Sequence, residues 1–112
     1  MCIKNITKGT VVADHMRPAA TFWQRLKGLL GTSSLPIGHG LVIKPCSSVH
    51  TFGMNYPIDV LFVDRHHRII KVVENLLPGK VSMASGSQYV VELPAGTARL
   101  AACSAGDILE LQ

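Results

Sequence analysis

The stretch Cys46 to Asp64, C-S-S-V-H-T-F-G-M-N-Y-P-I-D-V-L-F-V-D, decides the fold of this chain. Its last part, from Ile58 to Val63, is largely apolar at both odd and even positions. Since successive side chains of a strand point to opposite faces, this pattern predicts a central β-strand that is covered on both sides. The Gly-Met-Asn-Tyr-Pro run before it predicts a turn. The stretch therefore indicates two strands joined by a bend.

The sequence on either side extends this pattern into a β domain. Residues 64–67 predict a hairpin turn, and residues 68–74 alternate in the way expected of the partner strand. Pro18 is expected to end any regular ladder near the N-terminus. Further strands are expected at 3–14 (a pair or one broken strand), 40–43, 88–93 and 108–111, and loops at 31–40 and 75–87.

One helix is clearly indicated, at residues 21–30. Thr21 and Gln24 form a capping-box pattern, and apolar side chains follow at helical spacing. A short helical turn is expected at 97–103, where alanines follow Thr97. Together these elements predict a mainly β fold, a compact antiparallel sandwich- or barrel-like domain of about six to eight short strands.

Composition sets limits on size and partners. At 112 residues the chain is expected to form a single domain, residues 1–112. Charged residues make up only 16%, and the net charge is +4. The eleven basic residues are spread along the chain, whereas a nucleic-acid-binding protein usually carries a basic stripe or run. We therefore expect no nucleic-acid partner.

The cysteines and the apolar runs indicate the cellular compartment of the protein. The three cysteines, Cys2, Cys46 and Cys103, are odd in number and widely spaced, which does not fit a disulfide framework. No apolar run approaches the length of a membrane span, and the N-terminal residues lack the apolar core of a secretory signal. We predict a cytoplasmic protein with no membrane partner.

Several motifs, taken in order, resemble the DUF192 family of small proteins of unknown function. They are R-L-K-G-L-L-G at 25–31, T-F-G-M-N-Y-P-I-D-V-L-F-V-D at 51–64, I-I-K-V-V-E at 69–74 and Y-V-V-E-L-P-A-G at 89–96. Where many members have Trp-Met-Lys-Asn-Thr, this chain has Phe52-Gly53-Met54-Asn55-Tyr56. The resemblance implies a bacterial-type protein and a compact, mainly antiparallel β domain with a helix against it. It implies no reaction, because a fold alone does not define one.

The bend is the leading candidate site. Aromatic, thioether, amide and imidazole groups gather there next to a carboxylate, a mixture that suits small-ligand or peptide recognition. The expected site residues are His50, Phe52, Met54, Asn55, Tyr56 and Asp59. We predict a non-catalytic small-ligand or peptide-binding or accessory module, with loop 31–40 or 75–87 as its rim and with no cofactor. A structural role for Asp59, accepting backbone N–H groups beside the turn, is the simpler interpretation of that residue.

Two other functions remain open from the sequence. The first is an enzyme with hydrolase or thiol chemistry, in which His50 acts as a base with Cys46 as nucleophile and Asp59 as the orienting group. The second is a metal site formed by Cys46, His50 and Met54, with Cys103 or another His brought in from elsewhere. A regular strand resists that site, because four residues span roughly 13 Å. We therefore assign no metal ligands.

Overall fold

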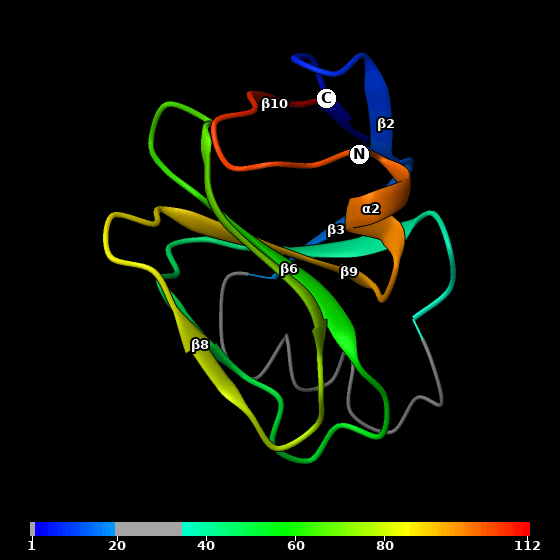
Figure 1. Cartoon of the computed structure of the whole chain (residues 1–112), viewed down its shortest axis with the longest axis vertical. Helices are drawn as coiled ribbons and strands as arrows, with labels where there is room; N and C mark the ends of the chain where they lie inside the picture. The colour runs from blue at the N-terminus through cyan, green and yellow to red at the C-terminus, as the bar shows by residue number, and fades with distance from the viewer. Residues whose placement is uncertain (1, 20–34) are drawn as a thin grey trace.

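Residues 2–19 and 35–112, which the computed structural model describes, form ten β-strands and one short helix (Figure 1). The strands are β1 (Ile3–Asn5), β2 (Thr10–Ala13), β3 (His15–Ala19), β4 (His39–Ile43), β5 (Ser48–His50), β6 (Ile58–Val63), β7 (Ile69–Leu76), β8 (Val81–Met83), β9 (Tyr89–Pro94) and β10 (Leu109–Leu111), and the helix is α2 (Thr97–Leu100). The mainly β class predicted from the sequence is confirmed.

The strands pair into three sheets. A five-stranded sheet has the order β3-β4-β9-β6-β7, a three-stranded sheet has the order β10-β1-β2, and β5 and β8 form a two-stranded ribbon. Every pair of neighbouring strands is antiparallel except β3 and β4, which run parallel. Because β2 leads into β3 through the single residue Asp14, one bent stretch of chain joins the two larger sheets.

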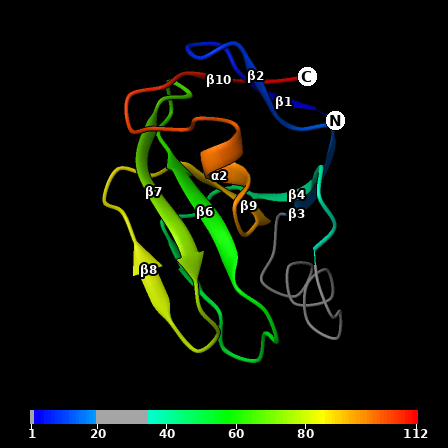
Figure 2. The same ribbon diagram turned by 45° about the vertical axis from the view of Figure 1, so that its right-hand side comes forward.

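The two larger sheets also meet at a second edge. Arg68 and Ile108 form an isolated antiparallel bridge, and the backbone N–H of Ile69 donates to the carbonyl of Asp107 at 2.8 Å. The three-stranded sheet therefore lies over one end of the five-stranded sheet and is connected to it on both sides (Figure 2). This arrangement confirms the sandwich- or barrel-like architecture.

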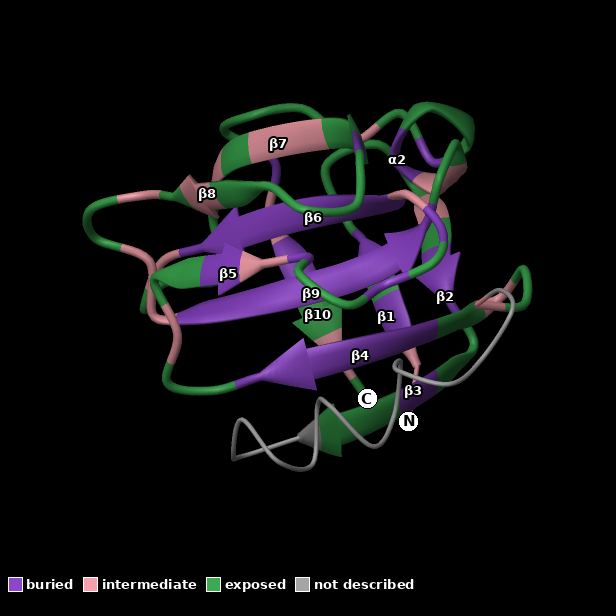
Figure 3. Ribbon diagram, turned by 90° about the horizontal axis from the view of Figure 1, so that it is seen from below, coloured by how far each residue is buried: buried purple, intermediate pink, exposed green. Residues whose placement is uncertain are grey.

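The two central strands of the five-stranded sheet, β6 and β9, are buried on both faces. Every residue of β6 and β9 is buried, as Figure 3 shows. Leu61 and Val91 face the three-stranded sheet and α2, and we name this set of buried residues the helix-side core. Val60 and Val90 face the β5–β8 ribbon and belong to the ribbon-side core. The prediction that 58–63 is a central strand covered on both sides is confirmed.

Some details differ from expectation. The described part of the chain has more than six to eight strands because two short segments gain partners that the sequence does not announce. Residues 15–19 form β3, which continues through Pro18; an edge strand tolerates proline because its outer N–H groups need no ladder partner. Residues 81–83, expected to be a loop, form β8 by pairing with β5. The helical turn expected at 97–103 is confirmed as α2, whereas the helix expected at 21–30 lies outside the described residues.

Candidate functional site

The predicted site residues at the bend separate into an exposed group and a buried group. Phe52 is 55% exposed, and its ring stacks on that of His50 with centroids 5.4 Å apart. Asn55 is also exposed. Met54 and Tyr56, in contrast, are at most 9% exposed and pack into the ribbon-side core. The bend therefore presents a surface made of His50, Phe52 and Asn55. The Met54 thioether and the Tyr56 ring instead stabilise the fold.

Asp59 is a structural residue. It is fully buried, and one carboxylate oxygen accepts the backbone N–H of Asn75 at 2.8 Å. The other oxygen accepts the N–H groups of Gly96 and Ala98, both at 2.9 Å. The carboxylate thus joins β6 to the end of β7 and to the start of α2. This is the simpler of the two interpretations that the sequence allowed.

The structure does not bring Asp59 together with Cys46 and His50. Asp59 shares its face of β6 with Leu61, in the helix-side core, and bonds to backbone groups around α2. Cys46 packs against the ribbon-side core on the opposite face of the sheet, and His50 lies in β5 on that same side. Since the sheet separates Asp59 from His50, the carboxylate does not orient the imidazole.

The metal constellation is not supported either. Cys103 packs against the helix-side core, on the face of the sheet opposite to Cys46. Within residues 2–19 and 35–112, no three or more His, Cys, Asp and Glu side chains are grouped so that they could hold a metal ion. The thiol of Cys46 donates instead to the carbonyl of Ser48 at 3.1 Å.

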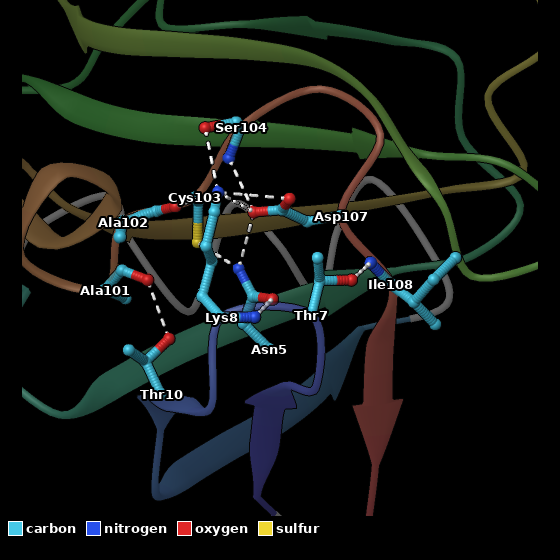
Figure 4. A network of polar contacts seen from close by, with 10 residues as sticks. All are labelled: Asn5, Thr7, Lys8, Thr10, Ala101, Ala102, Cys103, Ser104, Asp107 and Ile108. Carbon is cyan, nitrogen blue, oxygen red and sulfur yellow. Dashed lines mark hydrogen bonds and ion pairs between the residues drawn. The ribbon is translucent and has the colours of Figure 1, made fainter.

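A second polar cluster joins the two ends of the chain (Figure 4). The Lys8 ammonium and the Asn5 amide both donate to one oxygen of Asp107 at 2.9 Å. The backbone N–H of Ser104 donates to the same oxygen at 3.0 Å. Burial alone would raise the pKa of Asp107, but these donors outweigh it and lower that pKa below its usual value. The cluster fixes the β1–β2 turn against the loop that precedes β10.

Cys103 lies beside this cluster but is poorly suited to nucleophilic chemistry. Its sulfur accepts a weak hydrogen bond from the Asn5 amide at 3.8 Å. Burial raises the pKa of the Cys103 thiol, although the Asn5 contact acts in the opposite direction. A reactive cysteine needs a depressed pKa because the thiolate is the nucleophile. We assign Cys103 a packing role.

The clearest concave apolar surface lies elsewhere, between β2 and α2. Its volume is about 240 Å³, and the turn at Ile37 and Gly38 forms its third wall. Three large apolar side chains on its walls are strongly exposed, namely Val11 (56%), Ile37 (85%) and Leu100 (81%). We name this feature the β2–α2 groove.

Backbone hydrogen bonds hold the groove open. The N–H groups of Asp14 and His15 both donate to the carbonyl of Gly38, at 3.1 and 3.0 Å. Gly38 has a φ of +87°, and a Cβ there would lie 2.7 Å from the Asp14 carboxylate. Glycine is therefore required on two grounds, the left-handed backbone and the close approach of the acid. Asp14 is the charged residue that borders the groove.

A second pocket, of about 380 Å³, opens beside α2 on the side of β7. Asp59 lies at its base with both oxygens engaged, and Glu74 forms an ion pair with Arg99 at 3.6 Å. Four of its six lining residues carry charged or amide side chains, and the three charged ones already have partners within the protein. The pocket therefore leaves fewer side chains available for contact with a ligand than the β2–α2 groove does.

Sequence reasoning did not find the β2–α2 groove. The groove combines residues 11–14, 37–38 and 97–101, and none of these segments carries a motif. Ile37, between Pro36 and Gly38, was the available signal, because a large apolar residue in a turn of this kind is unusual. Neither this groove nor the second pocket is lined by the bend residues 50–56.

The fold and its surfaces define a small, mainly β domain with a packed core and shallow surface pockets. A family model matches residues 3–111, and the chain belongs to the DUF192 family, which is described only as an uncharacterized ACR. The resemblance seen in the motifs is confirmed. No helix among the described residues is long and apolar enough to cross a membrane.

The chain is similar to two curated proteins and two solved structures. A "UPF0127 protein" of Thermococcus gammatolerans is 30% identical over 96% of this chain and 72% of its own length, and one of Thermococcus sibiricus is 29% identical over 95% and 71%. A protein of unknown function from Novosphingobium aromaticivorans superposes with a TM-score of 0.82 at 23% identity, covering 98% of this chain and 82% of its own. A candidate transcription regulator from Sinorhizobium meliloti gives 0.80 at 25% identity, covering 97% and 89%. These relatives include archaeal and bacterial proteins, so the bacterial-type origin stays a prediction.

Proposed function

We propose that this protein is a non-catalytic binding module, which holds an apolar segment of a partner peptide in the β2–α2 groove. The observation that carries the proposal is the pair Ile37 and Leu100, which are 85% and 81% exposed and line two different walls of the same concavity. Exposed apolar side chains that gather around a hollow are typical of interaction sites.

The size of the groove favours a peptide side chain over a free small molecule. Sites for drug-sized ligands usually measure roughly 300–1,000 Å³ and enclose most of the ligand. The groove, at about 240 Å³, is smaller and open, which suits one or two anchoring side chains of a longer chain. The proposed site therefore moves from the bend, where Met54 and Tyr56 are already packed in the core, to the β2–α2 groove.

The proposed module works in the cytoplasm and does not bind nucleic acid. None of Cys2, Cys46 and Cys103 forms a disulfide with another described residue, which fits a reducing compartment such as the cytoplasm. The description of the Sinorhizobium relative raises DNA as a rival ligand. Two of the basic side chains form ion pairs within the protein, Lys8 with Asp107 and Arg99 with Glu74. A dispersed and partly paired set of charges does not favour phosphate-backbone binding.

A phage-displayed peptide library panned on the whole chain tests the proposal. We expect enriched peptides to share an apolar core, and their affinity, measured by fluorescence polarisation, to fall roughly tenfold in Leu100→Ser and in Ile37→Ser, a loss of about 1.4 kcal/mol each. Leu77→Ser is the matched control, since Leu77 is also exposed, at 50%, and lies outside the groove.

Two outcomes would contradict the peptide proposal. One is enrichment of peptides whose affinity is unchanged by both groove variants. The other is binding of a random DNA duplex that is stronger than that of any enriched peptide at physiological salt. Either result would remove the β2–α2 groove as the principal site of this protein.

A further inference from the structure

A separate apolar surface covers the outer face of the β5–β8 ribbon. His50 is the cross-strand partner of Val81, and Ser48 is the partner of Met83, so these four side chains share one face. Val49 points the other way and is buried in the ribbon-side core, which leaves the first face toward solvent. Val81 and Met83 are accordingly 53% and 62% exposed.

The same surface continues around the end of the ribbon. Phe52 stacks on His50, which extends the apolar face by an aromatic ring. The Thr51 hydroxyl donates to the carbonyl of Leu77 at 2.6 Å and accepts the N–H of Lys80 at 2.9 Å, which brings the residue 77–80 turn beside it. We name the exposed apolar side chains the ribbon-end patch. Its members are Phe52, Leu77, Val81 and Met83.

The charges around the ribbon-end patch have one sign. Residues 44–58 and 75–91, which build the ribbon and its turns, contain Lys44 and Lys80 but no Asp or Glu. Lys71 is brought to the edge of the ribbon, where its ammonium donates to the carbonyl of Met83 at 2.9 Å. Glu74, the acid that precedes the second segment, is held instead by Arg99 of α2.

We propose that the ribbon-end patch docks this protein onto an anionic lipid surface. Apolar side chains that flank lysines are the combination that binds the boundary between lipid headgroups and acyl chains, with the ammonium groups facing the phosphates. The lack of a membrane-spanning helix among the described residues bears on crossing a bilayer and not on contact with its surface.

The observations favour a lipid surface over a protein partner. None of the four patch residues lines either of the two pockets described above, so neither pocket gives this patch a hollow for an anchoring side chain. Its charges select for an anionic partner without any acidic group that would fix the orientation of a protein. This proposal is independent of the β2–α2 groove, which the docked protein leaves accessible because the groove is built from other segments.

Vesicle co-sedimentation tests the proposal. The purified chain is mixed with vesicles of phosphatidylcholine alone and with vesicles of equal parts phosphatidylcholine and phosphatidylglycerol. We expect binding to the anionic vesicles only, weakening as salt is raised. Val81→Ser and Phe52→Ser are each expected to reduce the partition coefficient by about tenfold, and both side chains are exposed enough to be replaced without loss of the fold.

Matched controls separate the ribbon-end patch from general stickiness and from net charge. Ile6→Ser removes an apolar side chain of equal exposure, 53%, from the β1–β2 turn, and should leave vesicle binding unchanged. Lys80→Glu should weaken binding severalfold, whereas Lys4→Glu makes the same change in net charge on the exposed face of β1 and should not.

Four results would overturn the proposal. They are an absence of binding to anionic vesicles at low salt, equal binding to both vesicle compositions, an equal effect of Ile6→Ser and Val81→Ser, and a dimer seen by light scattering that Val81→Ser dissociates. The last result would assign the ribbon-end patch to a second copy of this chain. Circular dichroism melts of each variant establish that a loss of binding is not a loss of fold.

Discussion

At the scale of single residues, the Asp59 carboxylate joins three segments through three backbone N–H groups. In Asp59→Asn the amide offers one oxygen in place of two and directs its own N–H₂ toward donors. We expect the free energy of unfolding to fall by roughly 3 kcal/mol, because buried donors lose a charged acceptor. Urea denaturation followed by circular dichroism measures the loss.

The control for this change lies in the same pocket. Glu74→Gln alters an exposed carboxylate that pairs only with the exposed Arg99 and should change stability by no more than about 0.5 kcal/mol. If Asp59→Asn were as stable as the parent protein, the structural role assigned to Asp59 would be wrong.

Asp107 makes stability depend on pH in an acidic window. Its pKa is lower in the folded protein than in the unfolded chain, where it is about 3.9. The resulting stabilisation is fully present above about pH 4 and is lost as the pH falls through the folded-state value. We therefore expect the stability difference between the parent protein and Asp107→Asn to be constant from pH 7 to 5 and to shrink below about pH 4.

Urea melts at each pH measure this difference, which should be of the order of 1 kcal/mol because Lys8 is partly exposed. Lys8→Met removes one of the donors that lower the Asp107 pKa, so the acidic window should narrow in that variant. A stability difference that is unchanged down to pH 2 would contradict the assignment.

Single residues at the bend were predicted with mixed success, for a physical reason. Alternation correctly placed Asp59 at the start of a buried strand, whereas Met54, which composition marked as a site residue, packs in the ribbon-side core. Composition did not show that Tyr56 is buried while Phe52 is exposed. The direction of a side chain in a bend depends on the particular backbone angles, and no period of two or 3.6 residues applies there.

At the scale of elements, β4 is packed closely between β3 and β9. A Cβ on Gly40 would lie 2.5 Å from the Met16 sulfur and 3.1 Å from the carbonyl oxygen of Glu92. Gly40→Ala should therefore destabilise the protein by about 1–3 kcal/mol, as overpacking usually does. Thermal and urea melts measure the effect.

A double-mutant cycle identifies which neighbour resists the added methyl group. If the Met16 sulfur is responsible, Met16→Ala with Gly40→Ala should cost roughly 1 kcal/mol less than the sum of the single changes. Additive costs would instead assign the clash to β9, where the Glu92 carbonyl oxygen and the Leu93 side chain both lie 3.1 Å from the added Cβ.

Elements were predictable where local pattern and tertiary context agree. The period-two runs of β6, β7 and β9 sit in the sheet as expected, with bounds shifted by one or two residues. β3 and β8 were missed because Pro18 and the serines around Val81 favour loops locally, and only pairing with β4 and β5 makes them strands. The parallel pairing of β3 with β4 has no local signal at all.

At the scale of the whole molecule, the surfaces were less predictable than the fold. The β2–α2 groove and the end-to-end cluster of Asn5, Lys8 and Asp107 both join segments about 90 or more residues apart. Periodicity reports only on neighbours in sequence, so such sites emerge once the chain closes on itself. The family resemblance indicated the class of fold, because related sequences share the long-range contacts that close the chain on itself.

The closure itself is testable by circular permutation. Cys2 and Gln112 exchange two backbone hydrogen bonds of 2.8 Å, so β1 and β10 bring the ends of the described chain side by side. A short Gly/Ser linker between the ends should therefore be tolerated if new termini are opened between Ser85 and Gly86, in an exposed turn. We expect a cooperative urea transition and a loss of no more than about 2 kcal/mol in the free energy of unfolding.

Opening the chain between Val60 and Leu61, both fully buried in β6, should abolish the transition, because the central strand then loses its continuity. Equal stability of the two permutants would show that the closed arrangement of sheets does not govern folding, whereas failure of both would show that Cys2 and Gln112 cannot be joined without loss of the fold.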